Sequence, residues 1–326
     1  MAFGRKHAVV SEEEAGRYVK VEKKKGAWKK SLKTQKQIWI ISILALSWCI
    51  LFNYVPMVGN IIAFYQWYPG QSLSQAKFVG LDNFTRFFKL PAFKQVMRNT
   101  LVISGLNLTI GFMAPIIFAL LLNEIGNKTF KKVVQTISYL PYFVSWVVVA
   151  SIMLFLLGTE GAVNQFLMWL GVIEKGKNYL SEKDMFWGIM TAANIWKGIG
   201  WSAIIYISAI TGVDQELYQA GSVDGLGRFG KVWHITIPGI LPTIVVLFIL
   251  GIGGILNAGF EYQLLLGNSA TQSVYEVIDT YVYKYGIQQG NYTFGTAVGL
   301  MKSVFGFFLV WLTNYISGKV LDLRIF

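Results

Sequence analysis

Cysteine and histidine are almost absent from this sequence. Its 326 residues include one cysteine, Cys49, and two histidines, His7 and His234. A single cysteine excludes a disulfide or a cysteine metal site within the chain, and so few histidines argue against zinc. The carboxylates are scattered, and no Walker A glycine-lysine loop occurs. We therefore expect no metal site, no catalytic residues and no ATPase site of its own.

Charge is also scarce, which sets the class of protein. Only 14% of the residues are charged, 54% are hydrophobic, and the mean hydropathy is +0.49. A helix needs roughly 20 apolar residues to cross the hydrocarbon core of a bilayer. Stretches with few or no charges predict an all-α polytopic membrane protein with about six transmembrane helices. The predicted spans are 38–57, 100–122, 134–157, 186–210, 240–258 and 296–316.

The distribution of basic residues predicts the orientation. Residues 1–36 contain eleven Lys or Arg against four Glu, which is typical of a cytoplasmic tail, and anionic lipid accounts for this charge without nucleic acid. Six spans in the predicted domain 37–320 then place the short tail 321–326 in the cytoplasm as well. One group of basic residues weakens the rule, because it falls in the first external loop: Lys77, Arg86, Lys89, Lys94 and Arg98.

The cytoplasmic loop 211–238 is more structured than a simple connector. Asp214 is a suitable N-cap, apolar residues then recur at helical spacing, and Gly225 can end this first helix. Pro238 then allows the chain to turn into the fifth span. A second short helix carries three apolar residues on one face: Phe229, Val232 and Trp233. This amphipathic pair either connects two spans along the membrane surface or docks to a partner.

The residue pattern of the loop resembles that of bacterial ABC importer permeases, in which Glu-Ala-Ala is followed after three residues by Gly and later by Ile-x-Leu-Pro. The matching positions are Gln219, Ala220, Gly221, Gly225 and 235–238, with Asp224 directly before the glycine. Gln replaces the family's Glu, and Gly replaces its second Ala. Further similarity, closest to the polysaccharide and oligosaccharide permeases of the carbohydrate-uptake group, lies in 53–57, 135–149, 195–201, 257–261 and 278–283.

This resemblance implies a type I importer permease in the bacterial cytoplasmic membrane. In the family, the permease hydrolyses nothing and forms half of a translocation pathway. It pairs with a second, different permease, two cytoplasmic ATPase subunits that bind ATP and Mg²⁺, and an extracellular solute-binding protein. The loop 211–238 would dock to an ATPase, with Phe229, Val232 and Trp233 bracing its base. The docking residues that the resemblance implies are Gln219, Ala220, Gly221, Asp224, Gly225, Phe229, Trp233 and Pro238.

Polar residues within apolar spans point to a transport path, because a lysine at the bilayer centre costs roughly 2.5 to 3.5 kcal/mol on insertion scales. Asn194, Lys197 and Trp201 share a helical face at i, i+3 and i+7, and Asn257 and Glu261 are spaced i, i+4. These two stripes could line one cavity. Aromatic faces and hydrogen-bonding groups suit sugars, and lysines suit acidic ones, but Lys197 could equally form a structural ion pair with Glu261.

Lys302 is the other lysine inside a span. Its place beside small residues predicts a protein-facing side chain, in either a water-filled cavity or contact with a carboxylate. In a cavity shared with the other polar residues, Lys302 would help to select acidic solutes, whereas a network with Glu261 or around Lys197 would make it structural. The resemblance thus predicts the permease of an importer for an oligosaccharide, and the two lysines suit an acidic one. The alternatives are a secondary transporter or channel, and a permease for a different organic solute.

Overall fold

The computed structural model describes residues 35–320, so nearly all of the predicted basic tail and the predicted tail 321–326 lie outside the described residues. The chain divides into two units, residues 1–59 and residues 60–326. The described part of the first unit contains helix α3 (Lys36–Cys49), a π-helical segment (Ile50–Tyr54) and α4 (Val55–Val58). None of its residues is buried, as expected for side chains that face lipid or another protein.

The second unit begins with a small hairpin and a short helix. Strand β1 (Tyr65–Gln66) pairs antiparallel with β2 (Lys77–Phe78), with Tyr65 opposite Phe78. Helix α5 (Asp82–Lys89) follows, and its buried Asn83 donates hydrogen bonds to the carbonyls of Ala63 and Tyr65 at 2.8 and 3.0 Å. The hairpin is therefore fixed to α5.

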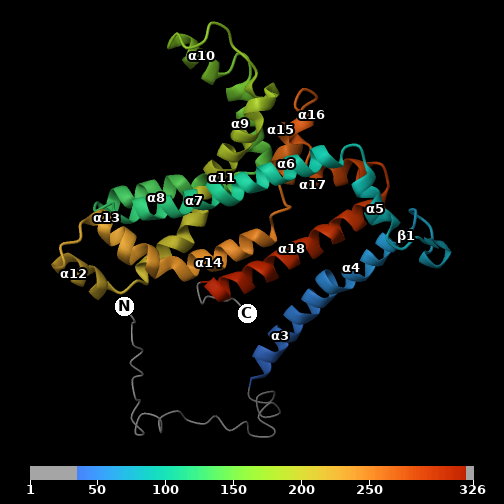
Figure 1. Cartoon of the computed structure of the whole chain (residues 1–326), viewed down its shortest axis with the longest axis horizontal. Coiled ribbons are helices and arrows are strands. Elements are labelled where there is room, and N and C mark those ends of the chain that lie inside the picture. Colours follow the sequence, from blue (N-terminus) through green and yellow to red (C-terminus); the bar gives the residue numbers. More distant parts are fainter. Residues whose placement is uncertain (1–34, 321–326) are drawn as a thin grey trace. The chain divides into compact units, whose positions relative to one another are not determined.

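Helices make up most of the remainder (Figure 1). Their bounds are α6 (Phe93–Leu106), α7 (Phe112–Asn123), α8 (Lys128–Phe143), α9 (Trp146–Leu157), α10 (Ala162–Trp169), α11 (Lys183–Thr211), α12 (Gln215–Val223), α13 (Arg228–Lys231), α14 (Ile237–Gly253), α15 (Phe260–Leu266), α16 (Gln272–Tyr275), α17 (Ile278–Val282) and α18 (Tyr292–Val320). Within this unit, α12 and α13 lie at the end opposite α5 and β1. The all-α polytopic fold class is confirmed.

Prolines account for three π-helical segments in the long helices. Pro56, Pro115 and Pro238 each follow such a segment, at 50–54, 107–111 and 232–236 respectively. Proline has no N–H for the carbonyl four residues earlier, and its ring clashes with that carbonyl. In each case this carbonyl belongs to the π-helical segment, where wider turns accommodate it. The predicted turn at Pro238 is therefore wrong. Pro238 lies in a helix that is continuous from Arg228 to Gly253.

Five helical segments among the described residues are long and apolar enough to cross a membrane. They are Lys36–Phe64, Phe93–Asn123, Trp146–Trp169, Arg228–Gly253 and Tyr292–Val320. The predicted fourth span coincides with α11, a helix of 29 residues that is not among the five. Polar side chains along its middle, including Asn194 and Lys197, dilute its apolar character. Such a helix suits a position inside a bundle rather than against lipid.

The predicted third span, 134–157, is not one helix. It is broken between α8 and α9 at Val144 and Ser145, both of which have extended backbone conformation. Pro141 weakens the last turn of α8, and the Ser145 side chain caps α9 by accepting a hydrogen bond from the backbone N–H of Val148. This break places non-helical backbone inside the second unit, where it borders a cavity.

The buried core lies where the long helices meet. Ile116 of α7, Ala203 and Tyr206 of α11, and Ile240 of α14 form one cluster, which Val213 extends to the start of the loop 211–238. A second cluster joins α5, α6, α17 and α18 at the other end. Helices α14 and α18 approach closely at Gly306, where a Cβ atom would lie 2.7 Å from the carbonyl oxygen of Gly253.

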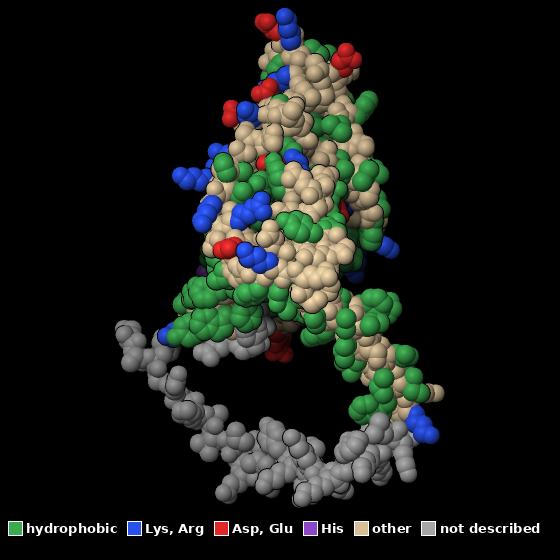
Figure 2. Space-filling model, turned by 90° about the vertical axis from the view of Figure 1, so that its right-hand side faces the viewer, with side chains coloured by type: hydrophobic (Ala, Val, Ile, Leu, Met, Phe, Trp, Pro, Cys, Tyr) green, Lys and Arg blue, Asp and Glu red, His purple; other side chains and the backbone are tan. Residues whose placement is uncertain are grey.

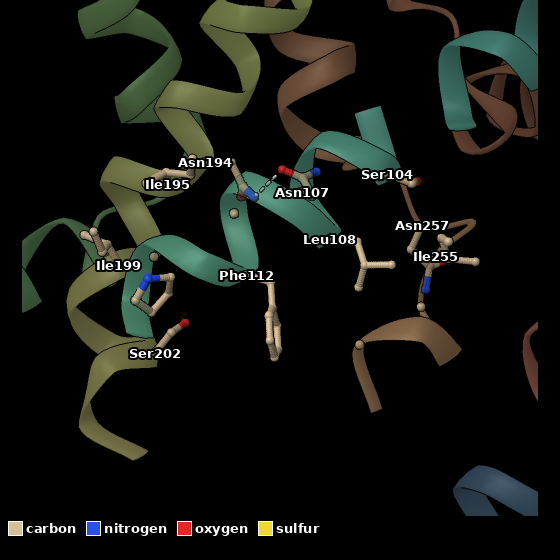
Figure 3. A pocket seen from close by; sticks show the side chains of 15 residues that line it. Ser104, Asn107, Leu108, Phe112, Asn194, Ile195, Ile199, Ser202, Ile255 and Asn257 are labelled. Carbon is tan, nitrogen blue, oxygen red and sulfur yellow. Dashed lines mark hydrogen bonds between the residues drawn. The ribbon is translucent and has the colours of Figure 1, made fainter. Parts of the chain in front are cut away.

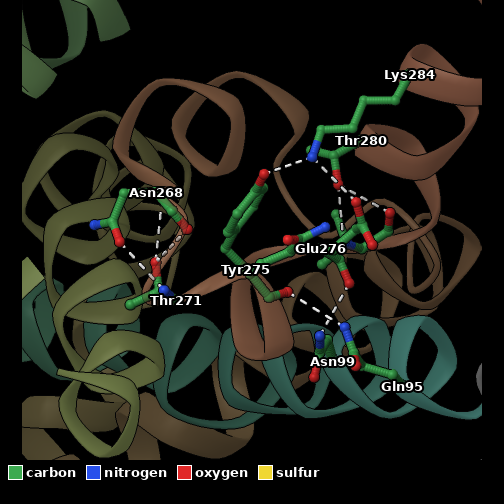
Figure 4. A network of polar contacts seen from close by, with 10 residues as sticks. Gln95, Asn99, Asn268, Thr271, Tyr275, Glu276, Thr280 and Lys284 are labelled. Carbon is green, nitrogen blue, oxygen red and sulfur yellow. Dashed lines mark hydrogen bonds and ion pairs between the residues drawn. The ribbon is translucent and has the colours of Figure 1, made fainter. Parts of the chain in front are cut away.

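A network of polar contacts attaches residues 268–284 to α6 (Figure 4). The fully buried Asn99 donates hydrogen bonds to the carbonyls of Ser273 and Glu276, each at 3.0 Å. Lys284 forms an ion pair with Glu276 at 3.1 Å and contacts the Tyr275 hydroxyl. Burial lowers the pKa of Lys284, but its contacts with Tyr275 and Glu276 outweigh this effect and raise the pKa above its ordinary value. Lys284 therefore remains charged at neutral pH and ties residue 284 to Tyr275 and Glu276 within the segment, while Asn99 attaches the segment to α6.

Candidate functional site

A cavity of 330 Å³ with both apolar and polar lining lies between α6, the π-helical segment 107–111, α11 and the chain that follows α14 (Figure 3). Ser104, Asn107, Asn194, Ser202 and Asn257 supply its polar lining. The Asn194 side chain donates a hydrogen bond to Oδ1 of Asn107 at 3.1 Å. The hydroxyl of Ser104 is buried and has no hydrogen-bond partner in the described chain. A buried polar group of this kind is available to a polar occupant of the cavity.

A second cavity, of 410 Å³, lies at the break between α8 and α9. Its lining includes Tyr142, Ser145, Trp146, Lys197 and Glu261. Asn194 and Gly198 line both cavities. The two cavities therefore adjoin along one face of α11 and together offer aromatic rings, amides and charged groups of both signs.

Lys197 connects α11 to the broken span. Its Nζ donates hydrogen bonds to the carbonyl oxygens of Tyr142 at 2.7 Å and Pro141 at 3.3 Å, which are at the C-terminal end of α8. The same Nζ lies 5.5 Å from the ring centroid of Tyr142 and 5.7 Å from that of Trp146. A cation at a helix C-terminus satisfies unpaired carbonyls and complements the helix dipole. Lys197 thus stabilises the break while lining the cavity.

The structure brings most of the predicted pathway residues together. Asn194 and Asn257 line the first cavity, and Asn194, Lys197 and Glu261 line the second. Trp201 lies outside both linings and stacks on Tyr142, with ring centroids 4.5 Å apart and planes 6° apart. The predicted ion pair between Lys197 and Glu261 is absent from the ion pairs of the described residues.

The predicted helical stripe of Asn257 and Glu261 is wrong. Helix α14 ends at Gly253, residues 254–259 are not helical, and Glu261 belongs to the next helix, α15. Gly259 has a φ of +79°, a left-handed conformation that favours glycine and separates the two helices. Both residues nevertheless border cavities that Asn194 also lines, because this irregular chain passes beside α11.

Lys302 has a carboxylate partner, and this partner is Asp279 of α17. Both side chains are largely buried, and Lys302 is in the lining of neither central cavity. The pair joins α18 to α17. Removing one member of a buried pair leaves an uncompensated charge, which typically costs about 3–5 kcal/mol.

We expect Lys302→Met to lower the Tm of the purified chain, since Asp279 then lacks its partner. The double variant Lys302→Met/Asp279→Asn should recover part of this loss. Thermal unfolding of the three proteins tests the pair directly. A Lys302→Met protein of unchanged Tm that transports acidic solutes less well than neutral ones would instead support the predicted role in solute selection.

The loop 211–238 has the two helices that the sequence predicts. Asp214 caps α12 through a hydrogen bond from the backbone N–H of Glu216 at 2.9 Å, and Gly225 has a φ of +80° just after the helix. The second helix is longer than predicted, because α13 continues through a π-helical segment into α14. The loop is therefore a short helix and a tight turn attached to the base of α14.

The predicted bracing role of Phe229 and Trp233 is wrong, because their side chains are 93% and 70% exposed. Instead, the hydroxyls of Tyr218 and Thr236 are 2.9 Å apart and join α12 to the base of α14. At the buried Gly221, a Cβ atom would lie 2.8 Å from Cδ1 of Ile235. Glycine therefore allows a closer approach than the family's alanine.

All the predicted docking residues except Gly221 are exposed. The exposed ones are Gln219, Ala220, Asp224, Gly225, Phe229, Trp233 and Pro238. Val223 is also 89% exposed, so the loop presents three large apolar side chains that no part of the described chain covers. Exposed apolar side chains of this size are typical of a protein or membrane contact when they lie together.

Sequence reasoning missed several residues of the two cavities. Ser104 and Asn107 were detectable, because they are polar residues within a predicted apolar span. Ser145, in the predicted third span, carried the same signal, but Tyr142 and Trp146 did not, since they border a cavity only because the helix breaks beside them.

Comparisons with known proteins agree with this architecture. Residues 111–322 match the family described as binding-protein-dependent transport system inner membrane component. Protein LplB of Bacillus subtilis is 43% identical over 90% of this chain and 92% of its own length. The polygalacturonan/rhamnogalacturonan transport system permease protein YteP of the same organism is 43% identical over 87% of this chain and 88% of its own length.

A solved structure has the same fold. A chain in the crystal structure of a bacterial alginate ABC transporter, in complex with an alginate pentasaccharide-bound periplasmic protein, is 35% identical with a TM-score of 0.83. The match covers 92% of this chain and 100% of that chain. The predicted resemblance is confirmed: this chain belongs to the family of binding-protein-dependent transport system inner membrane components, and it is the permease subunit of an ABC importer.

Proposed function

We propose that this permease forms half of the pathway by which an acidic oligosaccharide enters a bacterial cell. The observation that carries the proposal is the pair of adjoining cavities along α11, which combine amide groups, aromatic rings and Lys197. Amides and hydroxyls can exchange hydrogen bonds with sugar hydroxyls, and a lysine attracts a carboxylate. Two of the similar proteins support an acidic substrate. One is named as a polygalacturonan/rhamnogalacturonan permease, and the other belongs to an importer of the acidic polysaccharide alginate.

The proposed partners follow from the family and from the exposed loop. A second, different permease would complete the pathway, two cytoplasmic ATPases would bind ATP and Mg²⁺, and an external solute-binding protein would deliver the saccharide. The exposed Phe229 and Trp233 supply the apolar contact to an ATPase. Movement of the docked loop would alternate access to the cavities. The chain itself contributes no ATP hydrolysis to this cycle.

We further propose that both termini are in the cytoplasm, as the basic tail indicates. This orientation places the loop 211–238 on the side of the ATPases and the hairpin β1–β2 outside. Reporter fusions at each end measure the orientation, and an external signal from either terminus contradicts it.

Asn194 is the residue that tests the pathway most locally, because it lines both cavities. Asn194→Leu removes the hydrogen bond to Asn107 and places an apolar group in the path. We expect transport of an acidic oligosaccharide by the complete importer to fall by about tenfold or more, on the scale of a lost buried hydrogen bond.

Ser208→Leu is the matched control, because Ser208 is an exposed residue of α11 that lines neither cavity. Initial uptake rates are measured for both variants at equal amounts of assembled importer. Equal uptake by the Asn194→Leu and Ser208→Leu importers would show that the cavities are not the path.

A further inference from the structure

The first external loop carries an unusual surplus of positive charge. Residues 60–100 contain a single carboxylate, Asp82, and the five basic side chains in this segment are all exposed: Lys77, Arg86, Lys89, Lys94 and Arg98. Figure 2 looks onto the end with β1 and α5, where Lys and Arg outnumber Asp and Glu. The basic bias of permease loops normally lies on the cytoplasmic side. A basic residue on the opposite side that also lines a cavity therefore points to an anionic ligand, and Arg86 is the one of the five that does so.

A polar cavity of 470 Å³ lies within this basic region, between the hairpin, α5 and the start of α18. Its size is within the range of small-molecule sites. Trp67 and Tyr68 supply aromatic rings, and Asp82 and Arg86 supply charges. Most of the remaining lining consists of side-chain amides, namely Gln66, Asn83, Gln289 and Asn291.

Hydrogen bonds and ring contacts hold this cavity in shape. The Trp67 indole N–H donates to the carbonyl of Gln71 at 2.6 Å, and the Trp67 ring meets Tyr292 edge-on with centroids 6.5 Å apart. Asn83 fixes the opposite wall by its two bonds to the hairpin backbone. Gly290, with a φ of +71°, provides the turn before α18. These contacts fix the walls of the cavity, so the site is preformed.

The lining distinguishes between two kinds of occupant. Protein partners typically anchor a bulky apolar or aromatic side chain in an apolar pocket. This cavity instead surrounds two rings with amides and charges, which suits a sugar ring with one apolar face and hydroxyls at its edge. Arg86 forms no ion pair among the described residues, and its guanidinium lies 5.7 Å from the centroid of Phe294. A guanidinium fixed against a ring and lacking a carboxylate is suited to receive one.

We propose that this cavity is an external binding site for one acidic saccharide unit, with Arg86 meeting its carboxylate. The inference rests on the proposed function for its substrate class but concerns a different place, at the end of the second unit opposite the loop 211–238. The site would hold the end of an oligosaccharide before it reaches the central cavities.

Two substitutions of neighbouring charges should have opposite effects. The probe is the alginate pentasaccharide, titrated calorimetrically into the purified complete importer in lipid nanodiscs without its solute-binding protein. Arg86→Gln should weaken binding by about tenfold, the size of a lost charge-assisted hydrogen bond. Asp82→Asn should strengthen binding by about threefold, because it removes from the cavity a negative charge that repels the carboxylate of the saccharide. A merely structural role for these residues does not predict opposite signs.

Lys94→Gln is the matched control, since Lys94 is exposed and basic but does not line the cavity. It should leave the affinity within about twofold, as expected for a distant, screened surface charge. Maltopentaose, a neutral saccharide of the same length, should bind more weakly than the pentasaccharide.

Three results would overturn the site. The first is that the importer does not bind the pentasaccharide, and the second is that Arg86→Gln and Lys94→Gln lose affinity for it equally. The third is that the Arg86→Gln importer still binds the saccharide but no longer captures the solute-binding protein. Uptake is measured separately in the same preparations. An importer that transports only neutral saccharides contradicts the proposed function, whereas normal acidic uptake with unaltered binding in Arg86→Gln contradicts the external site alone.

Discussion

Phe229→Asp is expected to reduce ATP-dependent uptake by roughly thirtyfold or more while leaving the permease folded. The side chain is 93% exposed, so its replacement removes no internal contact. At a protein interface, an anchoring aromatic residue typically contributes about 2 kcal/mol or more, and a buried, unpaired carboxylate adds a further cost. Copurification of the ATPase with the tagged permease measures the loss of docking directly.

Trp169→Asp provides the control for this prediction. Trp169 is also a largely exposed aromatic residue, but it ends α10 and is remote in the sequence from the loop 211–238. It should leave ATPase copurification unchanged. If Phe229→Asp retains both the ATPase and full uptake, the loop does not couple the permease through this residue.

Lys197→Met should have the second-largest effect, because Lys197 has both a structural and an electrostatic role. The substitution leaves the carbonyls of Pro141 and Tyr142 without their hydrogen-bond donor. Each carbonyl that becomes buried and unpaired lowers the free energy of unfolding by about 1–3 kcal/mol. It also removes the positive charge from the cavity of 410 Å³. We expect a Tm lowered by several degrees and uptake of acidic saccharides reduced by about tenfold or more.

Lys197→Gln separates these two roles, since its amide keeps a hydrogen-bond donor but carries no charge. It should restore much of the Tm while still transporting acidic saccharides less well than neutral ones of equal length. Thermal unfolding and paired uptake assays provide the two measurements. Equal losses for acidic and neutral saccharides in Lys197→Gln would leave Lys197 with a structural role only.

The sequence predicted the membrane class, most spans and the two helices of the loop 211–238 for a physical reason. Long apolar runs have few alternatives to a spanning helix, and Asp214 and Gly225 have local roles that depend only on neighbouring backbone. Asn194 and Asn257 were likewise detectable, since polar groups within apolar runs require a polar environment. Their shared cavity follows from that requirement, and contact with substrate stays a prediction.

Long-range geometry was less predictable. The break at Val144 and Ser145 is stabilised by Lys197, which reaches the end of α8 from another helix, a contact that no periodicity indicates. The sequence predicted that Lys302 faces a cavity, with a network around Glu261 or Lys197 as the alternative, but its partner is Asp279 of α17. Charge within a span indicated a polar environment but could not identify the partner, because that residue is supplied by another helix.

Reconstituted transport tests the central claim most directly. The permease is placed in vesicles with its partner permease and two ATPases, and the solute-binding protein and labelled pentasaccharides are added at the external face. We predict that uptake of the alginate pentasaccharide requires ATP hydrolysis, exceeds that of maltopentaose, and is lost without the ATPases. Uptake that persists without ATPases and follows an ion gradient, or that is restricted to the neutral saccharide, would contradict an ATP-driven importer of acidic oligosaccharides.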